Sequence, residues 1–285
     1  MLNSINSSLL FSFFFPAFTL LGGVPLLRWA TTGENKDIVG SFAVGLACWI
    51  GVICAFGQVG EPFQFGMNAL AYGVGIITLG GLFAALFLRH PVLRMCAGVL
   101  LCFVWVWVIT GMTTQMDMFI KALLAGSVLL VLSLIFTFKM RAEFGNPETP
   151  LSWLITPLVL NCTLAGFAFY LGDQMAGHFA ISLVVVVVGT IIWGHERTPG
   201  ALSENAVFPI SLCTATLVWD MWLQGHLPLL SIFCFVLVLF SHYGAEQVLN
   251  RAPAWLQKSE PLIRVVVSLL PIGLSVVFFD ILRSL

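Results

Sequence analysis

The sequence predicts an all-α fold, a polytopic integral membrane protein with about ten transmembrane helices. Hydrophobic residues make up 59% of the chain and charged residues only 9%, whereas a soluble domain is about 25% charged. The apolar residues are grouped in stretches of roughly 17 to 22, which is close to the roughly 20 residues that a helix needs to cross a bilayer. Lys and Arg fall mainly in every second gap between the stretches. These three observations together exclude an ordinary soluble enzyme or binding domain.

The predicted membrane-spanning stretches follow one another with short polar gaps between them. They are Ser8–Leu27, Ile38–Gly57, Met67–Leu88, Val92–Met112, Met118–Phe138, Leu151–Leu171, His178–Gly194, Asn205–Leu223, Leu227–Tyr243 and Leu262–Leu282. The seventh and ninth stretches are short for a span, but polar turn residues bound each of them. The long gap after the ninth stretch, Gly244–Pro261, mixes apolar and charged residues. We expect a hydrated loop there, and the alternative is a short amphipathic segment at the headgroups.

The charge distribution predicts the orientation of the helices. Of the 12 Lys and Arg residues, all but Lys121 and Arg283 fall in the gaps after the first, third, fifth, seventh and ninth stretches or, for Arg94 and Arg264, at the third residue of the next stretch. The other gaps carry the acidic residues Glu61, Asp117 and Asp173, and Asp220 lies near the end of the eighth stretch. Because Lys and Arg of short loops stay on the cytoplasmic side, we expect both termini outside. The short loops favour a bacterial inner (plasma) membrane.

The chain is predicted to be a single transmembrane domain, 1–285, with two halves. Helices one to five occupy 1–143 and helices six to ten occupy 144–285. Because five is odd, two structural repeats of five helices would be inverted relative to each other, as in many transporters whose substrate site lies between the repeats. The first helix of each half carries a proline, Pro16 and Pro157. No residue-level repeat supports this hypothesis.

Small residues predict close helix packing in the first half. Ala47, Gly51 and Ala55 stand four apart on the second stretch, so they share one helix face. Such stripes allow two backbones to approach closely. We expect an internal contact here in preference to a dimer interface.

The strongest candidate for a substrate-binding residue is Asn161, near the middle of the sixth stretch. Thr163 follows it closely, and Pro157 lies one turn before it. Polar groups deep in a membrane helix are costly and are frequently functional. The alternative is a structural hydrogen bond between helices. Thr214 and Thr216 on the eighth stretch are weaker candidates, because threonine can bond to its own helix backbone.

A second candidate site is the carboxylate of Asp220 with the neighbouring Trp219 and Trp222. A carboxylate with aromatic walls suits an organic cation, and the outer side is predicted to be net acidic, which would attract cations. The alternative is that Asp220 is simply hydrated at the end of a helix. No ionisable residue lies at the middle of a stretch, which argues against a proton-driven antiporter.

The sequence shows no pattern that is typical of a metal site, a haem site or a catalytic site. The 7 cysteines lack metal-ligand spacing, and the 5 histidines lie at the ends of stretches, which disfavours a buried haem. We therefore expect no catalytic residues, no metal, no cofactor and no nucleic acid. Three hypotheses remain: a small-solute transporter or channel with a site between the halves, a non-catalytic scaffold or accessory subunit of a larger membrane complex, and, least favoured, an enzyme that acts on lipid. The expected partners are membrane lipids, a small-molecule solute and other membrane proteins.

Overall fold

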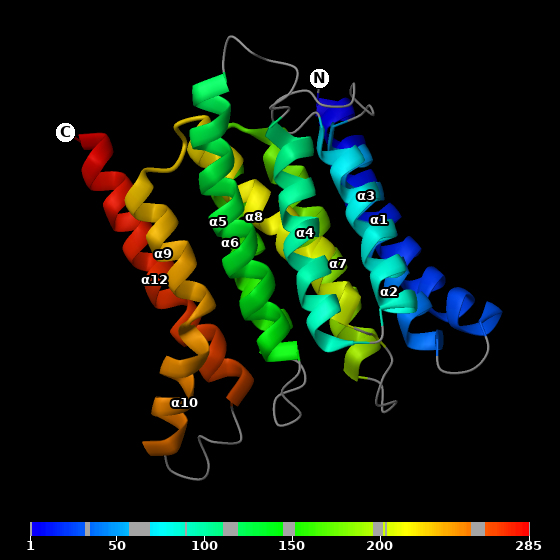
Figure 1. Ribbon diagram of the computed structural model, residues 1–285. Coiled ribbons are helices and arrows are strands. Elements are labelled where there is room, and N and C mark those ends of the chain that lie inside the picture. The colour runs from blue at the N-terminus through cyan, green and yellow to red at the C-terminus, as the bar shows by residue number, and fades with distance from the viewer. Residues whose placement is uncertain are drawn as a thin grey trace.

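The computed structural model is a bundle of roughly antiparallel helices (Figure 1). The structure describes residues 2–31, 35–56, 69–88, 90–110, 119–144, 152–195, 202, 204–251 and 260–284. These residues form helices and turns without a strand. The predicted all-α fold class is confirmed.

The helices follow the predicted apolar stretches in order. They are α1 (Leu2–Ala30), α2 (Lys36–Phe56), α3 (Leu70–Phe87), α4 (Pro91–Thr110), α5 (Phe119–Phe144), α6 (Ser152–Leu171), α7 (Gln174–His195), the 3-10 turn η4 (Glu204–Ala206), α8 (Val207–Leu223), α9 (Leu229–Leu239), α10 (Ser241–Arg251) and α12 (Glu260–Ser284). Within the described part of the chain, seven of these helices are long and apolar enough to cross a membrane. The protein is therefore a multi-pass membrane protein by the length and composition of its helices.

The two short predicted stretches, the seventh and the ninth, form different structures. The seventh is part of a 22-residue helix, α7, because residues 174–177, which precede His178, continue the helix instead of ending it. The ninth is the 11-residue helix α9, which bends by 54° into α10. Counting this bent pair as one span gives up to eight membrane spans. Two further apolar helices are shorter, namely α8 and the apolar part of α12 (Leu262–Val277). Ten spans therefore remain a prediction.

The region after the ninth stretch is partly helical. Residues Ser241–Arg251, expected to be mostly loop, form the polar helix α10. Ser241 Oγ lies 2.7 Å from Ser268 Oγ of α12, which ties the start of α10 to its neighbour. The rest of the expected amphipathic segment, including Lys258, lies outside the described residues.

Most of the described Lys and Arg residues lie at one end of the bundle, and two of them, Lys121 and Arg283, lie at the other. Helix α1 begins and α12 ends at the same end, at the top of Figure 1. The opposite end, which we call the basic end, holds the described residues Arg28, Lys36, Arg94, Lys139, Arg141, Arg251 and Arg264. We call the end with Asp173 and Asp220 the acidic end. Glu61, Arg89, Asp117 and Arg197 lie outside the described residues.

The small-residue stripe of α2 lies in an internal contact, as expected. A Cβ added at Gly51 would come within 2.9 Å of Ser182 Cβ on α7, and Ala47 is fully buried. Ser182 Oγ also donates a hydrogen bond to the Ser12 carbonyl of α1, at 2.9 Å. Helices α1, α2 and α7 therefore pack as one group that joins residues from both predicted halves.

Candidate functional site

Helix α8 lies at the centre of the bundle. Every residue from Val207 to Met221 is buried, and the helix packs against α2, α3, α5, α6 and α7. A helix that is buried on all sides needs apolar residues around its whole circumference, and α8 mostly has them. Its polar residues must therefore find partners inside the bundle, because an unpaired polar group is costly there.

Three hydroxyl groups of α8 find partners on three different helices. Ser211 Oγ lies 3.1 Å from Thr137 Oγ1 of α5. Thr214 Oγ1 accepts a hydrogen bond from Asn161 Nδ2 of α6 at 3.0 Å. Thr216 Oγ1 accepts one from Trp105 Nε1 of α4 at 2.9 Å.

The same hydroxyls also bond to their own helix. Thr214 Oγ1 donates to the Ile210 carbonyl at 2.8 Å, and Thr216 Oγ1 donates to the Leu212 carbonyl at 2.9 Å. Because each hydroxyl has one hydrogen to give, it serves the neighbouring helix as an acceptor. Each threonine therefore bonds to its own helix, as expected, and also accepts a hydrogen bond from a neighbouring helix.

Asn161 of α6 is fully buried, and its side chain is only partly satisfied. Its Nδ2 donates to the Pro157 carbonyl at 2.8 Å as well as to Thr214. Its Oδ1 has no hydrogen-bond partner among the described residues. A buried acceptor without a partner costs about 1–3 kcal/mol. The structural hydrogen bond between helices is therefore present, and the substrate-binding role of Asn161 remains a prediction.

The structure does not bring the other predicted site residues to Asn161. Thr163 Oγ1 donates to the Val159 carbonyl of its own helix at 2.8 Å. Trp219 Nε1 donates to the Ala125 carbonyl of α5 at 2.8 Å, and Trp222 is half-buried against the core. Asp220 lies six residues beyond Thr214, which is about 9 Å along the helix axis.

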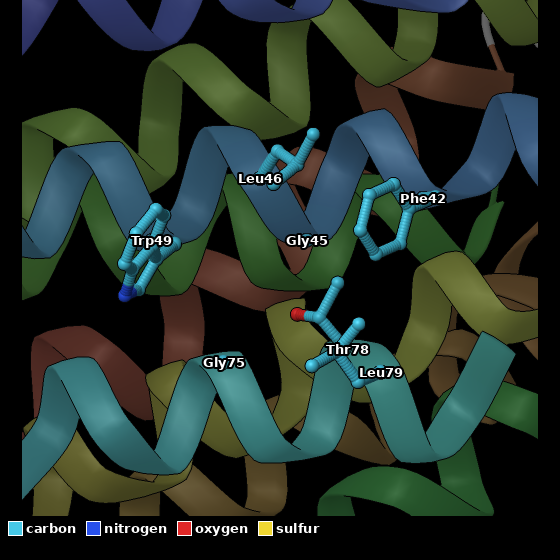
Figure 2. A pocket seen from close by; sticks show the side chains of 7 residues that line it. All are labelled: Phe42, Gly45, Leu46, Trp49, Gly75, Thr78 and Leu79. Carbon is cyan, nitrogen blue, oxygen red and sulfur yellow. The ribbon is translucent and has the colours of Figure 1, made fainter. Parts of the chain in front are cut away.

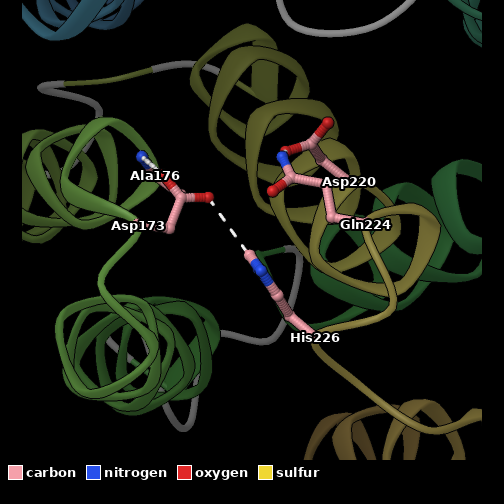
Figure 3. A network of polar contacts seen from close by, with 5 residues as sticks. All are labelled: Asp173, Ala176, Asp220, Gln224 and His226. Carbon is pink, nitrogen blue, oxygen red and sulfur yellow. Dashed lines mark hydrogen bonds and ion pairs between the residues drawn. The ribbon is translucent and has the colours of Figure 1, made fainter.

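A separate polar network lies at the acidic end (Figure 3). Asp173 caps the start of α7, since its Oδ1 accepts a hydrogen bond from the Ala176 backbone N–H at 3.1 Å. Its Oδ2 lies 4.0 Å from His226 Nδ1. Asp220 Oδ2 accepts a 2.6 Å hydrogen bond from Gln224 Nε2, and Asp220 is only 5% exposed.

Two tight turns hold this network. Gly172 (φ +83°) precedes Asp173, and Gly225 (φ +75°) precedes His226. Both glycines adopt the left-handed conformation that other residues rarely take. The turns bring a carboxylate from the α6–α7 connection near an imidazole from the α8–α9 connection. No group of three or more metal-ligating side chains occurs within the described ranges.

The side chains that form hydrogen bonds with α8 were not predicted from the sequence. Thr137 and Ser211 give no signal alone, because single hydroxyl residues are common in membrane helices. Trp105 lies deep in the fourth stretch, which predicts packing between helices or against a cavity but does not identify its partner. The available signal was the spacing of Ser211, Thr214 and Thr216 on one apolar stretch. It shows that the helix carries several hydroxyls but not which helices they face.

The described fold is that of an all-helical, multi-pass membrane protein in which the buried helix α8 carries several polar side chains. No protein-family model, curated protein or solved structure matches the chain. Function is therefore argued from the geometry alone.

Proposed function

We propose that the chain is a small-solute transporter or channel whose polar path follows α8. The observation that carries this proposal is the run of buried polar groups from Ser211 to Asp220. These two residues are nine apart, which is about 14 Å along the helix, or about half of a 30 Å hydrocarbon core. Polar side chains at this depth are costly and commonly mark a solute pathway.

Asn161 supplies the proposed binding group near the middle of this path. Its unpartnered Oδ1 can accept a hydrogen bond from a solute N–H or O–H. Its Nδ2 is already engaged by Pro157 and Thr214, which fixes the orientation of the amide. The path is therefore proposed to select a small solute with a hydrogen-bond donor.

The two halves of the chain meet along α8. The Thr216–Trp105 and Ser211–Thr137 contacts each join a residue of 144–285 to a residue of 1–143. This agrees with a site between two five-helix halves, and inverted repeats remain part of the proposal. Asp173 would give the outer entrance a negative charge that favours a cationic solute.

A flux measurement tests this function. The protein is reconstituted into liposomes, and their swelling is followed by light scattering under gradients of glycerol, urea and methylammonium chloride. We expect faster swelling than in protein-free liposomes for at least one solute, and loss of that gain in Asn161→Leu. Thr163→Val is the matched control, because its hydroxyl bonds only to its own helix among the hydrogen bonds described. Swelling at the protein-free rate for all three solutes would contradict the proposal.

The proposed topology has both termini outside a bacterial inner membrane. An alkaline phosphatase fused after Asp173 should be active, and one fused after Arg141 should be inactive. Asp173 and Arg141 lie at opposite ends of the bundle. The reverse pattern of activity would overturn this orientation.

A second function, a scaffold or accessory subunit, is favoured by one observation. Several polar side chains of α8 bond to neighbouring helices, and the helix is buried from Val207 to Met221, as in a purely structural core. In that case, purification in a gentle detergent should retain stoichiometric membrane-protein partners. A solitary, monodisperse protein would count against the scaffold.

A further inference from the structure

An apolar groove lies between α2 and α3 on the side of the bundle (Figure 2). It has a volume of about 170 Å³, and α2 lines it with Phe42, Leu46 and Trp49, which share one helix face because they are spaced four and three apart. Gly75 of α3 leaves room opposite, since a Cβ added there would meet only Trp49 Nε1, at 4.0 Å. Trp49 is 37% exposed, so the groove marks the outward face of α2.

An inner face of α2 packs against α8. Ser41 and Gly45 of α2 line the same small hollow as Pro209 of α8, so the two helices lie side by side there. Both helices start near the basic end and run in the same direction. Cys48 is three residues beyond Gly45, and Cys213 is four residues beyond Pro209. Each cysteine thus lies about 5–6 Å further along the same helix face, which places both at one level.

The two thiols meet at this level. The side chain of Cys213 is in hydrogen-bond contact with that of Cys48. Both are free thiols, and their residues are 0% and 1% exposed. Cys102 is equally buried but contacts a hydroxyl instead, Thr137 Oγ1 at 3.9 Å. A disulfide needs Cβ atoms about 4 Å apart, which two thiols already in contact reach by side-chain rotation and a small shift of the helices.

We propose that Cys48 and Cys213 are an oxidative modification site, whose disulfide joins α2 to α8 and so links the two predicted halves of the chain. The oxidant is a peroxide, such as hydrogen peroxide. One thiol reduces the peroxide O–O bond, becomes a sulfenic acid and releases one water. The second sulfur then attacks the sulfenic sulfur, the S–S bond forms, and the hydroxyl group leaves with the thiol proton as a second water. Two thiols and one peroxide therefore give one disulfide and two waters.

The apolar surroundings favour the disulfide as the end product. A disulfide is uncharged, whereas the sulfinic acid that further oxidation would give is polar and costly to bury. Hydrogen peroxide is uncharged and small, so it can enter when α2 and α8 separate locally. Burial slows the reaction, and the pair should therefore react more slowly than the exposed Cys96. The site does not depend on solute transport along α8.

Peptide mapping after oxidation tests the site. The protein in liposomes is treated with hydrogen peroxide or with iodine, an apolar oxidant that dissolves in the bilayer. Remaining thiols are blocked with N-ethylmaleimide, and the digested protein is analysed by mass spectrometry. We expect peptides joined through Cys48 and Cys213 that separate on reduction. Cys48→Ala and Cys213→Ala should each abolish this product, whereas Cys102→Ala, the matched buried control, should leave it unchanged.

Unfolding by SDS gives a second readout. The oxidised wild type should unfold at a higher SDS fraction than the reduced protein, because a cross-link restricts the unfolded chain. Oxidised Cys48→Ala should show no such shift, and size-exclusion profiles verify that each variant is folded. Absence of the Cys48–Cys213 product with both oxidants, under conditions that oxidise Cys96 completely, would overturn the proposal. Equal yields from folded and SDS-unfolded protein would also overturn it, because the fold would then not bring the thiols together.

Discussion

Helices α3 and α8 would occupy the same position in the two predicted halves, yet the structure gives them opposite environments. They have similar lengths, 18 and 17 residues. Helix α8 is buried from Val207 to Met221, whereas α3 exposes Leu79, Phe83 and Phe87. The α3 helix thus forms part of the outer wall and α8 forms the core.

The hydrogen bonding of the threonines also differs between the two helices. Thr214 and Thr216 of α8 each bond to their own helix and to a neighbouring one. Thr78 of α3 has no hydrogen-bond partner for its hydroxyl among the described residues. We infer that α8 is held by polar contacts in addition to packing, whereas α3 is held mainly by close backbone approach.

The largest expected effect concerns the α2–α3 contact. Gly45→Val should lower the free energy of unfolding by about 3 kcal/mol, because the new side chain overlaps Thr78 and forces the helices apart. Equilibrium unfolding by SDS in mixed micelles measures the change. Gly75→Val is the matched control and should change stability by less than about 0.5 kcal/mol, as expected for a residue in open space. Equal effects would mean that α3 is not held by close approach.

A tryptophan pair tests the polar contacts of α8. Trp219→Phe should cost about 2 kcal/mol, because it removes the hydrogen bond to the Ala125 carbonyl and leaves a small cavity. Trp49→Phe in the exposed groove should cost less than about 0.5 kcal/mol. The same unfolding measurement compares the two. If Trp49→Phe lowered the free energy of unfolding as much as Trp219→Phe does, the buried core and the outer wall would not differ in how much a tryptophan stabilises them.

A threonine pair gives the smallest and most specific effect. Thr216→Val keeps the shape but leaves Trp105 Nε1 without its acceptor, so it should cost about 1.5 kcal/mol. Thr78→Val removes a hydroxyl that has no hydrogen-bond partner among the described residues, so stability should stay the same or rise. Unfolding free energies within about 0.3 kcal/mol of each other would contradict the proposed role of the α8 hydroxyls.

The sequence was sufficient for the fold class and for most helix positions. Long apolar runs with few charges have one stable outcome, a helix that crosses a bilayer. The bend between α9 and α10 was not predicted. The composition changes after Phe240, where Ser241 and His242 follow, but this change alone does not distinguish the end of a span from a bend into a second helix. The basic end was predicted because the described Lys and Arg residues follow the expected alternation along the chain.

The site was predicted only in part. Asn161 is conspicuous because it is a single amide in an apolar stretch, and the structure adds its bond to Thr214. The roles of Trp105, Thr137 and Ser211 depend on which helix faces meet. Apolar residues surround these helices, so the sequence pattern does not reveal an inward face. The lateral groove likewise depends on the spacing of two helices, which no single stretch encodes.

The most direct test of the proposed path is the reactivity of cysteines placed on α8. Thr214→Cys and Ala215→Cys are made in a variant without the native cysteines, reconstituted into liposomes and treated with a small, charged methanethiosulfonate. Both positions are fully buried, so packing alone predicts that neither reacts. A water-filled path that reaches the Asn161–Thr214 contact predicts modification of Thr214→Cys and protection of Ala215→Cys, which is rotated by about 100° around the helix. Protection of both cysteines would contradict the path and favour the scaffold.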